Sequence, residues 1–218
     1  MNASMYGWAV ISTLKVTLIS FAVSYLLGLP LGVLLYGTAP GGIFPNKPLS
    51  TVLDMIVNII RSIPFIILLV MIQPLAKIVV GTKIGDNAFI FYLIVASFPY
   101  VARMIESSLR EVDRGVIEAA QSMGSDNWQI VTKVVIPEAK PSLIIGAAIA
   151  ITTILGYTPM AYLIAGSGLL GQLAIQYGLY RFDSKIMYIS SLLLIILVQV
   201  MQVVFNYFAK KTDKRIRG

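Results

Sequence analysis

The chain contains neither cysteine nor histidine among its 218 residues. Without cysteine it can form no disulfide and no thiolate metal site, and without histidine it lacks the commonest general base and metal ligand. Charge is also scarce: 12% of the residues are charged, against about 25% in soluble domains. Hydrophobic residues make up 57%. This composition predicts a chain built for lipid, and we assign it no catalytic, cofactor-binding or metal-binding residue.

Five apolar segments are long enough to cross a bilayer, which takes about 20 residues. They run roughly over residues 8–36, 52–80, 88–109, 141–164 and 186–209. All should be helices, because lipid offers no partner for open backbone groups. With no internal repeat and no linker, residues 1–218 are expected to form a single all-α transmembrane unit with five transmembrane helices.

Basic residues are distributed unevenly around these segments. With the N-terminus outside, eleven lysines and arginines fall inside and four fall outside. The inside set is Lys47, Arg103, Arg110, Arg114, Lys133, Lys140, Lys210, Lys211, Lys214, Arg215 and Arg217, and the outside set is Lys77, Lys83, Arg181 and Lys185. The excess predicts an external N-terminus and a cytoplasmic C-terminus. Membrane orientation thus explains the net charge of +7 better than nucleic-acid binding does.

A polar stretch, E-A-A-Q-S-M-G-S-D-N-W-Q-I-V-T-K-V-V-I-P over residues 118–137, separates the third and fourth predicted spans. The first of its two expected helices covers about residues 114–123, with Gly124 as a left-handed C-terminal cap. Ser125 or Asp126 can cap the second, with a glutamine three residues after Asp126. The loop of about residues 111–140 should lie parallel to the membrane on the cytoplasmic side.

The second helix of this loop is predicted to carry an apolar face formed by Trp128, Val131 and Val134. Pro137 should end that helix, because proline lacks the backbone N–H. Pro141 suits the first turn of the fourth span. A short amphipathic helix stranded in a loop of a membrane protein is best interpreted as a docking surface for a soluble partner.

The spacing E-A-A, three residues, glycine, nine residues and Val134-x-Ile136-Pro137 resembles the EAA loop of ABC importer permeases, whose form ends in I-x-L-P. The resemblance implies a coupling helix that lies in a groove of a cytoplasmic ATPase subunit. The implied contact residues are Glu118, Ala119, Ala120, Met123 and Gly124. An ordinary amphipathic loop at the lipid headgroups is the alternative, but residues 118–124 lack the lysines and arginines of such a helix.

Three further motifs look like the methionine importer permeases: N-I-I-R-S-I-P-F-I-I-L-L from Asn58, V-G-T-K-I-G from Val80 and G-Y-T-P-M from Gly156. That family implies a permease homodimer in the bacterial plasma membrane, two cytoplasmic ATP-binding subunits, an extracytoplasmic substrate-binding protein and a small-molecule substrate. Membrane lipid is an expected partner and nucleic acid is not. The chain has no G-x-x-x-x-G-K-[ST] phosphate loop, so ATP should be used by the partner.

Charged residues inside the predicted spans are the next candidates. Arg61 follows Asp54 by seven residues, which places both on one helical face. An intramembrane arginine either faces protein or water, or extends to the headgroups, and both interpretations stay open. Arg103 and Glu106 are three residues apart and could pair.

The G-Y-T-P-M motif supplies the pathway candidates Tyr157 and Met160. The resemblance implies that a methionine here narrows the translocation path, and its flexible side chain suits a plug that moves aside. A core or lipid-facing methionine is the alternative. Pro64, Pro74 and Pro99 can kink their helices, as in transporters, although packing could also explain them.

The sequence also leaves two alternatives to a methionine importer open. The chain could import another amino acid, a dipeptide or a small organic anion. It could instead be a secondary transporter or channel that works without ATP. Such coupling usually needs acidic residues deep in the spans, and the predicted fourth and fifth spans carry no charge.

Overall fold

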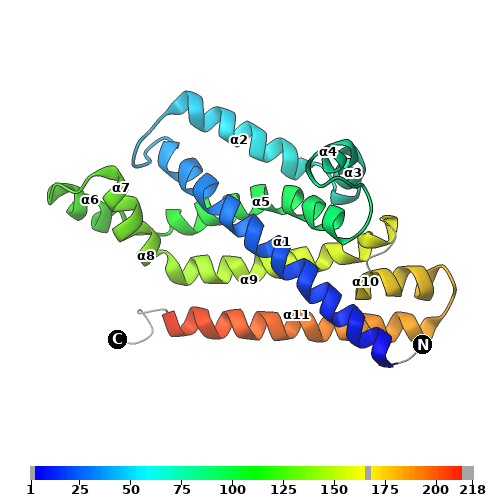
Figure 1. Ribbon diagram of the computed structural model, residues 1–218. Coiled ribbons are helices and arrows are strands. Elements are labelled where there is room, and N and C mark those ends of the chain that lie inside the picture. The colour runs from blue at the N-terminus through cyan, green and yellow to red at the C-terminus, as the bar shows by residue number, and fades with distance from the viewer. Residues whose placement is uncertain (1–2, 165–167, 213–218) are drawn as a thin grey trace. The chain divides into compact units, whose positions relative to one another are not determined.

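The structure is a computed structural model that describes residues 3–164 and 168–212, and every regular element in these ranges is helical (Figure 1). The elements are α1 (Ala3–Thr38), α2 (Lys47–Ser62), α3 (Phe65–Met71), α4 (Gln73–Val79), α5 (Asp86–Arg110), α6 (Arg114–Ser122), α7 (Asn127–Gln129), the π-helix η1 (Ile130–Val135), α8 (Ile136–Glu138), α9 (Lys140–Tyr157), the 3₁₀-helix η2 (Thr158–Leu163), α10 (Leu170–Leu173), the π-helix η3 (Ala174–Leu179) and α11 (Ser184–Thr212). The all-helical class is therefore confirmed.

Four helices of the described chain are long and apolar enough to cross a membrane. They are α1, α5, α9 continued by η2, and α11, and they match the first, third, fourth and fifth predicted segments. α2 and α3 together could form a fifth, broken span. The fourth span changes from α-helix to 3₁₀-helix after Tyr157, where Pro159 enters the first turn of η2.

The second predicted span is not the continuous helix expected over residues 52–80. α2 ends at Ser62, and Pro64 adopts an extended conformation with ψ 136°. Proline disfavours helical geometry at the preceding residue, so the chain leaves the helix at Ile63. The Pro64 carbonyl then accepts hydrogen bonds from the first amides of α3, including that of Ile67 at 2.9 Å. A further break follows at Ile72, with Pro74 in the first turn of α4.

The helices contribute to two compact units. Unit 1 comprises residues 1–24, 63–97 and 150–203, and unit 2 comprises residues 25–62, 98–149 and 204–218. The main core of unit 1 is apolar and aromatic, and gathers side chains from α1, α3, α5, α9 and η2. Its centre includes Phe65, Phe89 and Tyr92, all buried. A second cluster joins the beginning of α1 to α10 and α11.

Unit 2 depends on close approach of α1 to α5. Gly28 and Gly32 form the contact: a Cβ atom at Gly32 would lie 2.7 Å from the Ala102 carbonyl oxygen and 2.8 Å from the Ile105 side chain. Only glycine permits this separation, which is the role of small residues four apart in packed membrane helices. The G-x-x-x-G spacing is thus explained by packing between α1 and α5, and Pro30 lies within α1 without ending it.

Candidate functional site

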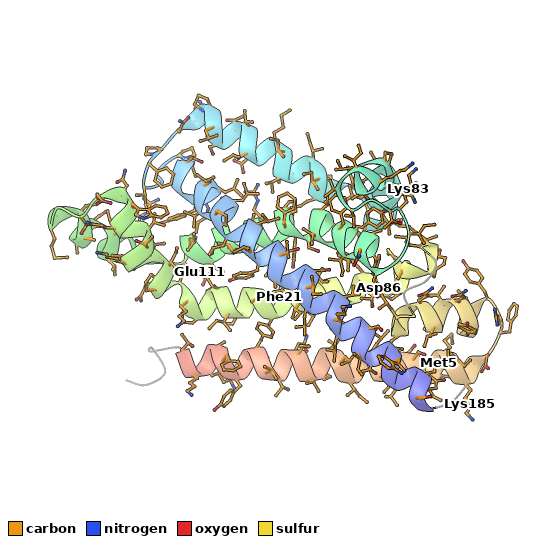
Figure 2. The ribbon with its side chains drawn as sticks, viewed as in Figure 1. Met5, Phe21, Lys83, Asp86, Glu111 and Lys185 are labelled. Carbon is orange, nitrogen blue, oxygen red and sulfur yellow. The ribbon has the colours of Figure 1, made fainter. Side chains whose placement is uncertain are left out.

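The polar stretch folds as a hairpin of short helices, α6 to α8, which we call the loop hairpin (residues 111–139) (Figure 1). Glu111, labelled in Figure 2, lies in the turn that joins α5 to this hairpin. The Asp113 side chain caps α6 by accepting a hydrogen bond from the Gly115 amide at 2.7 Å. The hairpin is therefore an ordered element of unit 2.

Gly124 ends α6 as the sequence predicts. Its φ is +79°, a value that glycine adopts without a steric penalty. The Gly124 amide donates to the Gln121 carbonyl at 2.9 Å, and the Ser125 amide donates to the Ala120 carbonyl at 3.1 Å. This paired pattern is the Schellman motif, which satisfies carbonyls that the end of a helix leaves open.

Asp126, and not Ser125, caps the second helix. Its Oδ1 accepts a hydrogen bond from the Gln129 amide at 2.8 Å, and the Gln129 side chain accepts one from the Asp126 amide at 3.4 Å. The predicted capping box is therefore confirmed. The helical path then continues through the π-helix η1 into α8.

Two predictions for this second helix are wrong. Pro137 does not end it, because Pro137 lies in the first turn of α8 and the path continues to Glu138. The wide π turn before Pro137 moves carbonyl groups away from the position where a proline ring clashes in an α-helix. Trp128 and Val131 do not lie on one apolar face, because Trp128 is 71% exposed and Val131 is 1% exposed.

α6 presents two opposite faces, since residues three and four apart share a side of a helix. On one face Val116, Ala119 and Met123 are exposed, Met123 to 79%. The other face lines a cavity of about 230 Å³ that we call the arginine pocket. Its walls include Tyr36, Arg110, Arg114, Glu118 and the backbone around Gly41.

The five residues expected to contact a partner are thus divided. Ala119, Met123 and Gly124 are exposed, whereas Ala120 is 2% exposed and packs inside its own unit. Glu118 is exposed but belongs to the pocket face of α6. The exposed surface of the loop hairpin, which we call its outward surface, is formed by Met123, Gly124 and Trp128 rather than by the E-A-A residues alone.

An ion-pair network connects α2 to α5 within unit 2. Arg103 Nη1 lies 2.6 Å from Glu106 Oε2, and Arg103 Nη2 lies 2.8 Å from Asp54 Oδ1. Glu106 Oε1 also accepts two hydrogen bonds from Arg110, at 2.7 and 3.1 Å. The Glu106 side chain is 5% exposed, so this carboxylate is the buried centre of the network. The predicted pairing of Arg103 with Glu106 is confirmed.

Arg61 lies in the last turn of α2 and is exposed. Its guanidinium carbon lies 5.9 Å from the centroid of the Tyr100 ring, a separation typical of a cation–π contact. Asp54, which the spacing placed on the face of Arg61, pairs with Arg103 instead. A cation in the last turn also interacts favourably with the helix dipole.

The pathway candidates lie in unit 1. The Tyr157 ring stacks on Phe65, with centroids 4.6 Å apart and planes inclined by 19°. Tyr157 and Met160 are both partly buried against the main core of this unit. The turn from α9 into η2 therefore places Tyr157 beside the start of α3 and Met160 against the same core. Within the described residues, no group of three or more acidic side chains could hold a metal ion.

Residues 28–218 match the model of a protein family described as the binding-protein-dependent transport system inner membrane component. The chain belongs to this family. The match covers all of the described chain except the first part of α1, and it includes the loop hairpin, the ion-pair network and both pathway candidates.

Individual members of this transport family are similar over most of their length. The probable D-methionine transport system permease protein MetI of Vibrio cholerae is 42% identical over 215 residues, which cover 99% of this chain and 95% of that protein. The methionine import system permease protein MetP of Bacillus subtilis is 40% identical over 182 residues, or 84% of this chain and 82% of that protein.

The fold is also similar to a solved transport complex. A chain of the MetNI methionine ABC transporter, in an inward facing conformation, superposes with a TM-score of 0.93 at 41% identity. The comparison covers 98% of this chain and all of that chain. The all-helical permease fold expected from the sequence is therefore confirmed for this chain.

Sequence reasoning missed two features of this permease. It did not find the arginine pocket, because the pocket brings residue 36 and residues 41–43 against α6 across a long sequence separation. It also left Asp54 without its partner Arg103, which lies 49 residues away. The Glu106 to Arg110 pair was visible as an i, i+4 pattern, a spacing that commonly supports helical ion pairs.

Proposed function

We propose that this chain is the permease subunit of an ATP-driven importer that carries methionine across the bacterial plasma membrane. The observation that carries the proposal is the agreement between sequence and fold over nearly the whole chain: 42% identity to one methionine permease and a TM-score of 0.93 to a methionine transporter chain. The chain supplies the membrane path, and a separate ATPase subunit supplies the energy.

The substrate is tested with the assembled transporter. The permease is purified with its ATPase subunit and reconstituted in vesicles, and ATP hydrolysis is measured with the extracytoplasmic binding protein and one solute at a time. Methionine should give the largest stimulation. A larger effect of another amino acid, a dipeptide or an organic anion would reassign the substrate. Uptake that persists without any ATPase subunit would instead identify a secondary transporter.

The proposed assembly has two permease copies, two ATPase subunits on the cytoplasmic side and a binding protein outside. The excess of basic residues around the loop hairpin and the C-terminus supports this orientation. Three of the counted residues, Lys214, Arg215 and Arg217, lie outside the described residues. Labelling of single cysteines at positions 83 and 133, in a chain that has no native cysteine, tests the orientation. Only position 83 should react from outside intact cells.

The proposed coupling surface is the outward side of the loop hairpin, centred on Met123 and Gly124. Gly124→Arg should leave the protein in the membrane but uncouple it, because a bulky cation then enters the contact with the ATPase. Gly124→Asn is the matched control, since asparagine tolerates a positive φ better than other side chains. Met123→Glu adds charge without backbone strain. Full uptake and normal co-purification of Gly124→Arg and Met123→Glu would disprove the assignment.

The E-A-A residues have different proposed parts in this coupling. Ala119 contributes to the outward surface, whereas the buried Ala120 keeps α6 close to the rest of the hairpin. Glu118 acts from the pocket side of α6 and reaches a partner only through a change in the hairpin. Ala120→Leu should therefore destabilise the permease itself, and Ala119→Leu should weaken retention of the ATPase without that loss of stability.

Met160 and Tyr157 are proposed to narrow the translocation path. Their partial burial against the main core of unit 1 supports this, because a side chain at the edge of a core can move without opening a cavity. Met160→Ala should raise substrate leak or basal ATP hydrolysis while assembly is retained. Met71→Ala, at a methionine that is 60% exposed, is the control. Unchanged transport and basal hydrolysis in Met160→Ala would rule out a gate there.

Arg61 is proposed to anchor the end of α2 at the membrane surface. Its exposure and its position over Tyr100 support an anchor rather than a substrate contact. Arg61→Lys should then retain transport, because lysine also extends to the headgroups. Loss of transport in Arg61→Lys at normal assembly would assign the guanidinium to a protein contact or the pathway.

A further inference from the structure

The arginine pocket has a wall whose shape is fixed by the backbone. After α1 ends, the chain turns back on itself: the Gly42 amide donates to the Ala39 carbonyl at 2.8 Å, and the Phe44 amide donates to the Gly37 carbonyl at 3.0 Å. A Cβ atom at Gly42 would clash with the Gly37 carbonyl oxygen, so the turn requires glycine there. The wall is therefore preformed.

Two guanidinium groups face this cavity. Arg110 is held in place by Glu106 and is about half exposed, at 51% of its side chain. Arg114 has no ion-pair partner within the described part of the chain, and its Nη2 lies 3.6 Å from the position of a Cβ at Gly41. Glu118 is the one carboxylate in the lining. The lining thus carries two guanidinium groups against one carboxylate, an excess of one positive charge.

The size of the pocket restricts what it can hold. Its volume is about 230 Å³. Pockets for drug-sized molecules usually measure about 300–1,000 Å³. A nucleotide is therefore too large, whereas a phosphate group with a few waters fits. Arginine binds phosphate oxygens with paired, charge-assisted hydrogen bonds.

We propose that the arginine pocket binds the phosphate group of an anionic phospholipid of the cytoplasmic leaflet. The pocket lies where two candidate spans, α1 and α5, end at Thr38 and Arg110. Basic pockets at the cytoplasmic ends of membrane helices commonly bind anionic headgroups. The cytoplasmic side rests on the proposed function, whereas the phosphate chemistry rests on the pocket alone.

A bound headgroup would connect the membrane to the loop hairpin. It would contact Arg114 at the start of α6, on the face opposite Met123. The lipid phosphate and Glu118 would share the same two arginines. A bound lipid would therefore hold α6 in place through its pocket face, and would leave the opposite face, with Met123, free to contact the ATPase.

The test measures lipid retention on the purified permease–ATPase complex in detergent by native mass spectrometry. Phosphatidylglycerol is the probe, and phosphatidylcholine, which is zwitterionic and carries no net charge, is the comparison. Arg114→Gln should weaken retention of phosphatidylglycerol about tenfold, as expected for loss of charge-assisted hydrogen bonds. Lys133→Gln, which makes the same charge change elsewhere in the loop hairpin, should change it less than about twofold, because exposed charges are well screened. Gln121→Glu, which adds a carboxylate to the pocket, should also weaken it.

Each opposite result overturns the proposal in a different way. Equal weakening by Arg114→Gln and Lys133→Gln would indicate general surface charge. Displacement by millimolar inorganic phosphate, without preference for phosphatidylglycerol, would assign the pocket to soluble phosphate. Normal lipid retention with loss of the ATPase from Arg114→Gln would assign it to the protein partner. None of these readouts involves transport, so a failure here leaves the substrate test untouched.

Discussion

The two compact units of this permease are each organised around one central side chain, but by different chemistry. In unit 1, Phe65 lies between Tyr157 and Phe89, with ring centroids 4.6 and 6.3 Å away. In unit 2, Glu106 lies between Arg103 and Arg110, with N–O distances of 2.6 and 2.7 Å.

The difference teaches where each unit can tolerate movement. Burial of apolar area does not depend on direction, and aromatic rings accept both stacked and edge-to-face arrangements, so rings can shift while apolar area stays buried. Charge-assisted hydrogen bonds depend strongly on distance and angle. Unit 1, which holds the pathway candidates, is therefore suited to repacking. Unit 2, which holds the loop hairpin, is suited to keeping a fixed geometry.

Phe65→Ala should have the largest effect on the free energy of unfolding, a loss of about 3–5 kcal/mol, because it empties the aromatic centre of unit 1. Ile67→Ala, in the same helix but 51% exposed, should cost less than about 1 kcal/mol. Chemical denaturation of the detergent-solubilised permease measures both. Similar losses for the two variants would show that the Phe65 cluster is not the centre of unit 1.

Glu106→Gln should lower the free energy of unfolding by about 2–4 kcal/mol, because it leaves two guanidinium groups without their shared carboxylate. This loss of stability is smaller than the loss expected for a fully buried ion pair, because both arginines reach solvent. Glu111→Gln, at an exposed carboxylate, is the matched control, measured by the same denaturation. If Glu106→Gln were neutral, unit 2 would not depend on its network and the contrast between the units would fail.

Gly32→Ala should destabilise the permease by about 1–3 kcal/mol, because the added methyl group overpacks the contact between α1 and α5. Gly7→Ala makes the same change in the same helix, where a Cβ meets no atom within 4 Å. That control should be neutral or slightly stabilising, since alanine favours helix. Thermal unfolding midpoints compare the two, and equal shifts would contradict the close approach in unit 2.

Phe182→Gly should have the smallest effect and the opposite sign. Phe182 in unit 1 has a φ of +57° and is 89% exposed, so it strains the backbone without burying its ring. Glycine removes a left-handed penalty of about 1–2 kcal/mol but loses about 0.5–1 kcal/mol in chain entropy, for a net gain of about 0.5–1 kcal/mol. Phe182→Ala keeps the strain and should give no gain. Equal denaturation midpoints for the two variants would show that the backbone is not strained at Phe182.

Local signals in the sequence predicted much of the fold. Long apolar runs located four spans, and the turn chemistry of Gly124 and Asp126 located both ends of the loop hairpin's central turn. Pro64 was a sequence signal for the break in the second span, because proline disfavours helical geometry at the residue before it. Apolar composition alone, however, cannot distinguish one long helix from several short ones. The π-helix before Pro137 has no comparable sequence signal.

The candidate site was less predictable because its geometry depends on long-range packing. The E-A-A motif located α6, but which of its faces is outward depends on the turn at residues 39–44, far away in the sequence. Arg103 was seen to be near Glu106 on one helix, whereas Asp54 could be paired with it only after α2 and α5 were placed. Helical periodicity had placed Asp54 only on the same helical face as Arg61.

The loop hairpin is joined to α9 by a single residue that lies outside both helical segments, Ala139. The arm from Asn127 to Glu138 is about 18 Å long at ~1.5 Å per residue. Helical hydrogen bonds continue through Ala139: its amide donates to the Val135 carbonyl at 2.9 Å, and its carbonyl accepts from the Leu143 amide at 2.9 Å. In the proposed coupling, a force applied at Trp128 would therefore reach α9 directly, because Ala139 is the single residue between the arm and the span.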